Sequence, residues 1–142
     1  MLIGIPEIIS PDLLAILSKM WHGDEIVLAD ANFPGERLNP NIVRCDGSEI
    51  IDLLKAILQV FPLDKSSKSP WVIMKASNSL HYDTSIEDEY FALLKKYAPD
   101  IEEAEKLERF DFYDRASKAY VVVMTRTKRR FGNIVIKKGT IF

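Results

Sequence analysis

The sequence has 142 residues, which is long enough for one domain with a hydrophobic core and too short for two. Apolar residues make up 47% and charged residues 28%, and no segment approaches the roughly 20 apolar residues of a membrane span. A net charge of −2 gives no general attraction to nucleic acid or to an anionic membrane, and a single cysteine excludes an intrachain disulfide. The first residues lack the basic start of a secretory signal, so we expect a cytoplasmic protein.

Predicted helices and strands alternate in the first half of the chain. Ser10-Pro11-Asp12 predicts a helix start, with serine as N-cap and proline at the first helical position, and the apolar face that follows ends near residue 21. Residues 25–29 are too few and too apolar for a helix and predict a buried strand. Two prolines and a glycine make residues 32–41 a loop. Residues 42–44 predict a short strand, and helical spacing predicts a second helix at 48–61.

The second half continues this alternation. Its predicted elements are a strand at 71–75, a helix at 85–97, a helix at 110–119 and a strand at 120–125. The last of these, YVVVMT, is apolar over four residues, as central strands are. A polar loop with His81 and Tyr82 precedes the helix at 85–97, and the acidic residues 101–109 stay ambiguous. After residues 126–130, a turn at Gly132-Asn133 leads to a last strand at 134–137, as a hairpin or a crossover.

The alternation of helices and strands predicts the α/β class. We expect a single-domain layered α/β sandwich over residues 1–142, because the sequence shows no repeat, no low-complexity segment and no linker.

Several common kinds of site lack their sequence pattern. The six glycines form neither a Walker loop nor a dinucleotide fingerprint, and two histidines and one cysteine never fall at metal-ligand spacing, so we expect no metal. No serine lies in a nucleophile elbow, and Cys45 is better explained as a small buried residue than as a nucleophile. The run Lys128-Arg129-Arg130 predicts a solvated turn or a subunit contact rather than a nucleic-acid site.

His22 and Asp30 flank the predicted strand at 25–29. If both side chains point into one cleft, they provide a group that titrates near neutral pH and a fixed acceptor, as proton transfer requires. The alternative is a surface histidine at a helix C-terminus, where a cation is favoured.

Further hydrogen-bonding residues lie at the starts of predicted loops and helices. Together they fit a polyhydroxylated ligand such as a sugar, because Arg and Asn donate to hydroxyls, Asp accepts, and an aromatic ring packs on apolar carbons. Each also has a structural explanation, such as turn formation by Asp30 or pairing of Arg109 with Glu105 or Glu108. The residues are His22, Asp30, Asp64, Arg109, Tyr113 and Asn133.

These residues lie in blocks that resemble the RbsD/FucU family of sugar mutarotases and pyranases. The blocks are GIPEIISPDLL, MWHGDEIVLADANFP, a DG followed by a helix ending in FPLD, ERFDFYDRASKAYVVV and FGNIVIKKG. They cover nearly the whole chain in the family's order and are closer to its fucose branch. The resemblance therefore implies an RbsD-like fold and cofactor-independent interconversion of the α and β anomers of L-fucose or a related monosaccharide.

The resemblance also implies roles for particular residues. His22 corresponds to the proton donor, Asp30 to a sugar-binding carboxylate that also serves the reaction, and Tyr113 to a residue that completes the proton relay. Sugar contacts are implied for Asp64 and Arg109 and for the tripeptide Phe131-Gly132-Asn133. The family further implies a homo-oligomer whose cleft is completed by a neighbouring subunit.

Three departures from the family pattern bear on these expectations. Phe131 replaces the usual tyrosine, Trp21 replaces a glycine before His22, and Thr125-Arg126-Thr127 replaces Thr-Gly-Glu. The missing hydroxyl at position 131 leaves two alternatives open: a sugar-binding protein without turnover, and a related isomerase such as one that exchanges ribose pyranose and furanose forms.

Overall fold

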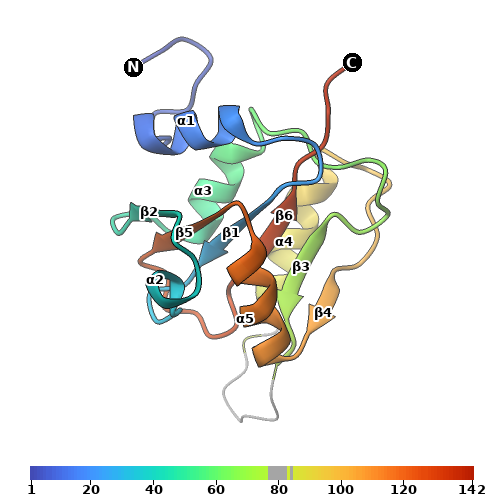
Figure 1. The fold of residues 1–142 in the computed structure, drawn as a ribbon. Coiled ribbons are helices and arrows are strands. Elements are labelled where there is room, and N and C mark those ends of the chain that lie inside the picture. Colours follow the sequence, from blue (N-terminus) through green and yellow to red (C-terminus); the bar gives the residue numbers. More distant parts are fainter. Residues whose placement is uncertain (77–82, 84) are drawn as a thin grey trace.

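The computed structural model describes residues 1–76, 83 and 85–142, and its centre is a six-stranded sheet (Figure 1). The strand order is β2-β5-β1-β6-β3-β4. The strands are β1 (Glu25–Ala29), β2 (Ile42–Cys45), β3 (Trp71–Met74), β4 (Glu105–Leu107), β5 (Val121–Thr125) and β6 (Ile134–Lys137).

Five of the six strands of the sheet run in the same direction. β1, β2 and β5 are mutually parallel, and so are β3 and β4, whereas β6 runs antiparallel between β1 and β3. All strands except β6 therefore share one direction, and their carboxyl ends meet at one edge. Both chain termini lie near the opposite edge, where α1 leads into β1 (Figure 1).

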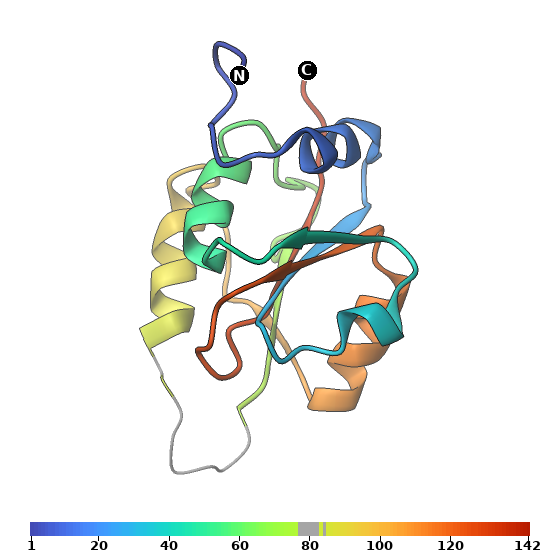
Figure 2. The same cartoon turned by 90° about the vertical axis from the view of Figure 1, so that its left-hand side faces the viewer.

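Helices cover both faces of the sheet, so the molecule has three layers (Figure 2). On one face α3 and α4 pack on a large core cluster, to which α1 adds Leu13 and Leu17. On the other face α2 and α5 cover a smaller cluster that includes Phe33 and Phe112. The helices are α1 (Pro11–Lys19), α2 (Gly35–Leu38), α3 (Ile50–Ile57), α4 (Ser85–Lys95) and α5 (Arg109–Lys118).

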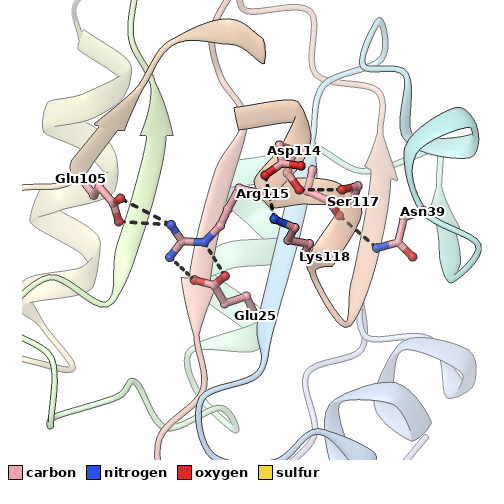
Figure 3. Close-up of polar contacts among 8 residues, drawn as sticks. Glu25, Asn39, Glu105, Asp114, Arg115, Ser117 and Lys118 are labelled. Atoms are coloured by element: carbon pink, nitrogen blue, oxygen red, sulfur yellow. Dashed lines mark hydrogen bonds and ion pairs between the residues drawn. The ribbon is translucent and has the colours of Figure 1, made fainter. Parts of the chain in front are cut away.

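Polar contacts fix α5 on the sheet (Figure 3). Arg115 makes a bidentate pair with Glu25 of β1, at 2.6 and 2.7 Å, and reaches Glu105 of β4 at 3.4 Å. Just beyond Arg115, buried Asn39 donates to the carbonyls of Ala116 and Ala119, at 3.0 and 2.8 Å. These carbonyls lie at the helix C-terminus, where the regular amide partners of the helix run out. The C-terminal half of α5 is thus fixed both to the sheet and to the segment that follows α2.

The predicted α/β layered fold is confirmed, and most predicted elements lie where the sequence placed them. The Ser10 hydroxyl caps α1 by accepting from the Leu13 amide at 3.2 Å. Two short elements were missed. The predicted loop at 32–41 contains α2, and the ambiguous stretch at 101–109 contains edge strand β4. β6 pairs with β1 and β3 rather than with β5, so the last connection is a crossover.

The structure bears differently on the predictions for the loop before α4 and for Cys45. The polar loop with His81 and Tyr82 lies outside the described residues. Cys45 is half-buried, and burial raises the pKa of its thiol. No helix in the described part of the chain is long and apolar enough to cross a membrane.

Candidate functional site

A cavity of about 430 Å³ opens at the carboxyl edge of the sheet. Its walls come from segments that follow β1, β3, β4 and β5 and from the segment that precedes β6. Ligands of α/β proteins commonly bind at this edge, and the volume is in the usual range for a small-molecule site. The wall includes Asp30, Phe33, Met74, Lys75, Glu108, Arg109, Tyr113, Phe131 and Asn133.

Asp30 is clamped by Asn133 through two hydrogen bonds. The Asp30 amide donates to Oδ1 of Asn133 at 2.7 Å, and Nδ2 of Asn133 donates to Oδ2 of Asp30 at 2.9 Å. The other carboxylate oxygen accepts from the Asn32 amide at 2.8 Å. Burial raises the pKa of Asp30 against the opposing effect of these donors. The carboxylate is therefore rigidly placed, at a cost in solvation that a hydroxylated ligand would offset.

Arg109 and Tyr113 lie one turn apart on α5 and form the opposite wall. Nε of Arg109 donates to the Tyr113 hydroxyl at 3.0 Å, and the Tyr113 ring meets Phe33 edge-on at 5.4 Å between centroids. In the described part of the chain, the two Nη nitrogens of Arg109 have no hydrogen-bond acceptor. This wall combines free guanidinium donors with aromatic surface, which suits a sugar.

Two other cations that line the cavity, Lys75 and Arg129, are held in ion pairs. Nζ of Lys75 lies 3.3 Å from a Glu108 oxygen. Nη2 of Arg129 contacts Asp83 at 2.7 Å and Glu89 at 2.6 Å. Arg109 differs from these two cations, because its Nη nitrogens remain available to hydrogen-bond a neutral polar ligand.

The segment before β6 closes the cavity with an unusual backbone. Phe131 has φ of +58°, a left-handed conformation that bulky residues seldom adopt. The next residue, Gly132, has no room for a side chain, because an added Cβ would lie 2.9 Å from the Arg129 carbonyl oxygen. Strain of this kind often occurs at binding sites, where surrounding contacts hold it in place.

His22 lies at the other edge of the sheet, before β1. Its Nε2 is 3.1 Å from Oδ1 of Asp64, and half of its side chain is exposed. The same Asp64 oxygen accepts from the amide and the hydroxyl of Ser66, at 3.0 and 2.7 Å. Burial alone would raise the pKa of Asp64, but the donors Ser66 and His22 outweigh it and lower that pKa. Asp64 is thus a satisfied carboxylate that orients the imidazole.

Within one chain, His22 and Asp30 do not share a cleft. The five residues of β1 separate them, and four steps of about 3.3 Å make roughly 13 Å for the strand alone. His22 and Asp64 line a different cavity, of about 760 Å³. The two side chains therefore do not point into one cleft within a subunit, where the imidazole contacts Asp64 instead of Asp30. The residues gathered at the Asp30 cavity are Arg109, Tyr113, Phe131 and Asn133.

Several residues that shape this cavity were not predicted from the sequence. Phe33 and Met74 supply apolar wall, and Lys75 and Glu108 form an ion pair at its rim. Lys75 had a signal, because it is the first polar residue after a buried strand whose carboxyl end reaches this edge. The ambiguity at residues 101–109 concealed the corresponding signal for Glu108.

Comparison with known proteins places the whole chain among sugar-related proteins. Residues 3–141 match the model of the RbsD / FucU transport protein family. The L-fucose mutarotase of Actinobacillus pleuropneumoniae serotype 5b (strain L20) is 43% identical over 139 residues, covering 98% of this chain and 96% of that protein.

Two crystal structures have nearly the same fold. FucU from Bifidobacterium longum superposes with a TM-score of 0.93 at 40% identity, covering 98% of this chain and 99% of that one. The fucose mutarotase from Streptococcus pneumoniae, solved in complex with L-fucose, gives 0.92 at 40% identity, with 99% and 100% covered.

Proposed function

The chain belongs to the RbsD/FucU family, and on this basis we propose that it is a mutarotase that interconverts the α and β anomers of L-fucose. The observation that carries the proposal is the cavity at the carboxyl edge, where Asp30, Arg109 and Tyr113 combine an acceptor, free donors and aromatic surface. Its full-length relatives named L-fucose mutarotase support the choice of sugar.

The chemistry needs two proton transfers. The ring oxygen of the cyclic hemiacetal gains a proton while the anomeric hydroxyl loses one, and the ring opens to the aldehyde. Rotation about the C1–C2 bond and re-closure give the other anomer. Positioned acids and bases each accelerate such steps by about 10²–10⁴-fold. Because the spontaneous reaction already proceeds in water, side chains that give and take protons are sufficient.

We assign the proton donor to His22 of a neighbouring subunit. His22 lies at the amino edge of the sheet. It can reach the Asp30 cavity of another subunit if the two subunits pack with this edge against that cavity. His22 is half exposed, and the preceding Trp21 is 80% exposed, as an interface anchor would be in an isolated chain. The site of the homo-oligomer would then combine His22 and Asp64 of one copy with Asp30 and Arg109 of another.

Within the cavity the remaining roles follow from position. Asp30 accepts a hydrogen bond from a sugar hydroxyl, and the free nitrogens of Arg109 donate to ring or hydroxyl oxygens. Tyr113, which accepts from Arg109, is placed to relay a proton. Phe33 and Phe131 offer apolar surface to the carbon face of the sugar.

A second candidate function is sugar binding without turnover. Phe131 motivates it, because the family tyrosine would bring a hydroxyl to this wall. A third is the same reaction on a related monosaccharide. A single cysteine fits a reducing compartment, and we propose the cytoplasm for all three.

Magnetisation transfer between the α and β anomeric protons of L-fucose, with and without protein, tests the proposal, with D-ribose run in parallel. Faster exchange of L-fucose alone supports fucose mutarotation. Binding detected by calorimetry without faster exchange would support the binding function. Acceleration of D-ribose alone would move the activity to the other branch of the family.

A further inference from the structure

Helix α4 lies on the face of the sheet opposite α5. It contacts the Phe131–Asn133 segment, which forms part of the wall of the cavity. Tyr90 of α4 is only 2% exposed, and its hydroxyl donates to the Gly132 carbonyl oxygen at 2.6 Å. Burial raises the pKa of Tyr90 far above its usual range, so the phenol stays a donor at every working pH. The hydrogen bond joins a buried donor to a buried acceptor.

The turn that receives this hydrogen bond needs support from outside. Its left-handed Phe131 is conformationally costly. The Gly132 amide donates back to the Arg129 carbonyl at 3.2 Å. From α4, Ile86 offers Gly132 only ordinary van der Waals contact, at 3.5 Å from an added Cβ, whereas Tyr90 provides a hydrogen bond.

The turn is directly coupled to the carboxylate that binds the sugar. Asn133 follows Gly132 in the chain and spends both ends of its amide on Asp30, at 2.7 and 2.9 Å. A shift of Gly132 moves Asn133, and with it the two hydrogen bonds that fix Asp30. The contacts thus form one chain from Tyr90 through Gly132 and Asn133 to Asp30.

A second contact joins α4 to the same turn, but it is of a different kind. Arg129 pairs with Asp83 and Glu89 while about a third exposed, and exposed ion pairs contribute little to stability. The Tyr90 hydrogen bond is buried, and leaving a buried carbonyl without a donor is costly. We therefore expect the hydroxyl, more than the ion pairs, to fix the turn.

We propose that Tyr90 is a positioning residue for sugar binding: its hydroxyl holds the Phe131–Asn133 turn and thereby sets the Asn133 clamp on Asp30. Tyr90 lines neither the cavity nor the His22 site, so it acts through the turn rather than on the sugar. The proposal rests on the mutarotase function and adds a residue from the opposite face of the sheet.

The test compares Tyr90→Phe with two controls. Tyr120→Phe makes the same chemical change at the start of β5, where the hydroxyl bonds to none of the described residues. Ile86→Val removes one methyl beside Gly132 and keeps the hydrogen bond. For each protein, exchange of L-fucose is measured against sugar concentration and pH, together with the melting temperature.

Tyr90→Phe should raise KM for L-fucose about threefold to tenfold, the equivalent of one hydrogen bond, with a smaller change in kcat. The acid limb of kcat/KM should move to higher pH, because Asn133 is a donor that lowers the pKa of Asp30. Both controls should keep the wild-type KM and acid limb. The other charged groups that face Asp30 around the cavity are unchanged in all variants: Lys75, Glu108, Arg109, Lys128, Arg129 and Arg130.

A double variant checks the route of the effect. In an Asn133→Ala background the Tyr90→Phe change should add less than twofold to KM, because the clamp is already absent. Full additivity, or a Tyr90→Phe variant that melts earlier with wild-type KM and acid limb, would overturn the proposal. If Tyr90→Phe does not fold, Gly132→Ala displaces the turn with Tyr90 in place, and an unchanged KM there would also overturn it. Wild-type protein without exchange activity would instead refute the mutarotase function.

Discussion

The two edges of the sheet each hold a buried or half-buried carboxylate, and their surroundings shift the two pKa values in opposite directions. At the carboxyl edge, burial raises the pKa of Asp30 although two backbone amides and the Asn133 side chain oppose it. At the amino edge, Ser66 and His22 hold the pKa of Asp64 below its usual value against the effect of burial. The donors therefore outweigh the effect of burial at Asp64 but not at Asp30.

This difference separates a ligand-binding carboxylate from a supporting one. A carboxylate whose pKa stays raised by burial despite its donors is stabilised by a further donor such as a sugar hydroxyl, and perturbed groups of this kind cluster at functional sites. Asp64, whose Oδ1 already interacts with Ser66 and His22, instead holds the imidazole of His22 in place. Under the proposed function, the residues assigned to proton donation and to sugar binding thus lie at two edges that a single subunit does not bring together.

Mixed oligomers provide the largest test of this division. His22→Ala and Asp30→Asn should each lower L-fucose exchange by about 10²–10⁴-fold, because each removes a group used in proton transfer or sugar binding. An equal mixture, dissociated and reassembled, should recover about one quarter of wild-type activity, the share of interfaces that join an intact His22 to an intact Asp30. Exchange spectroscopy on the mixture measures the recovery.

The matched control mixes Asp30→Asn with Asn133→Ala, which damage the same edge, and its activity should not exceed the average of the two separate variants. Native mass spectrometry verifies that subunits have exchanged. Absence of recovery in a verified His22→Ala and Asp30→Asn mixture would place both groups in one subunit and break the comparison of the two edges.

Removing the clamp on Asp30 should have the next largest effect. Asn133→Ala deletes two hydrogen bonds and leaves the Asp30 amide without its acceptor, so we expect a loss of about 3 kcal/mol in the free energy of unfolding. Urea denaturation followed by circular dichroism measures it. A loss below about 0.5 kcal/mol would mean that water replaces the amide and that the clamp contributes little.

Much of the fold could be predicted from local pattern. The strand at 25–29 and the run at 120–125 are apolar stretches bounded by polar residues, and the structure places both at the centre of the sheet. α2 and β4 could not be found in this way. Gly35–Leu38 is a single turn held by packing on β5 and α5, and Glu105–Leu107 is a strand because β3 pairs with it. Such elements depend on tertiary neighbours, not on their own periodicity.

For the candidate site as well, the sequence indicated some residues and gave no signal for others. The family-like blocks indicated Asp30, Arg109 and Asn133, which the structure brings together. The placement of His22 was also within reach, because a strand of five residues between His22 and Asp30 is a rigid spacer. The support from Tyr90 had no local signal, since it depends on how α4 crosses beneath the turn at Gly132.

Asp64→Asn should sharpen the comparison from the amino edge. Because the folded-state pKa of Asp64 is lowered, its charge stabilises the protein above about pH 4, and this contribution is lost as pH falls through the lowered pKa. We expect the variant to lose about 1 kcal/mol at pH 7 and to approach wild-type stability once the pH is below the lowered folded-state pKa. Urea midpoints across this pH range measure it. A difference that persists undiminished in acid would show that shape rather than charge is lost.

Phe131→Tyr should give the smallest effect, at the carboxyl edge. The new hydroxyl would add one partner for the sugar in a wall where Phe131 now presents an edge without polar atoms, and the backbone conformation suits both residues equally. One hydrogen bond of about 0.5–1 kcal/mol corresponds to a twofold to fivefold lower KM for L-fucose. Phe110→Tyr, on the exposed surface of α5, is the matched control and should leave KM unchanged. If Phe131→Tyr instead raised kcat with KM constant, the hydroxyl would act in the transition state. The carboxyl edge would then contribute to the chemical step as well as to sugar binding, contrary to the division of roles proposed for the two edges.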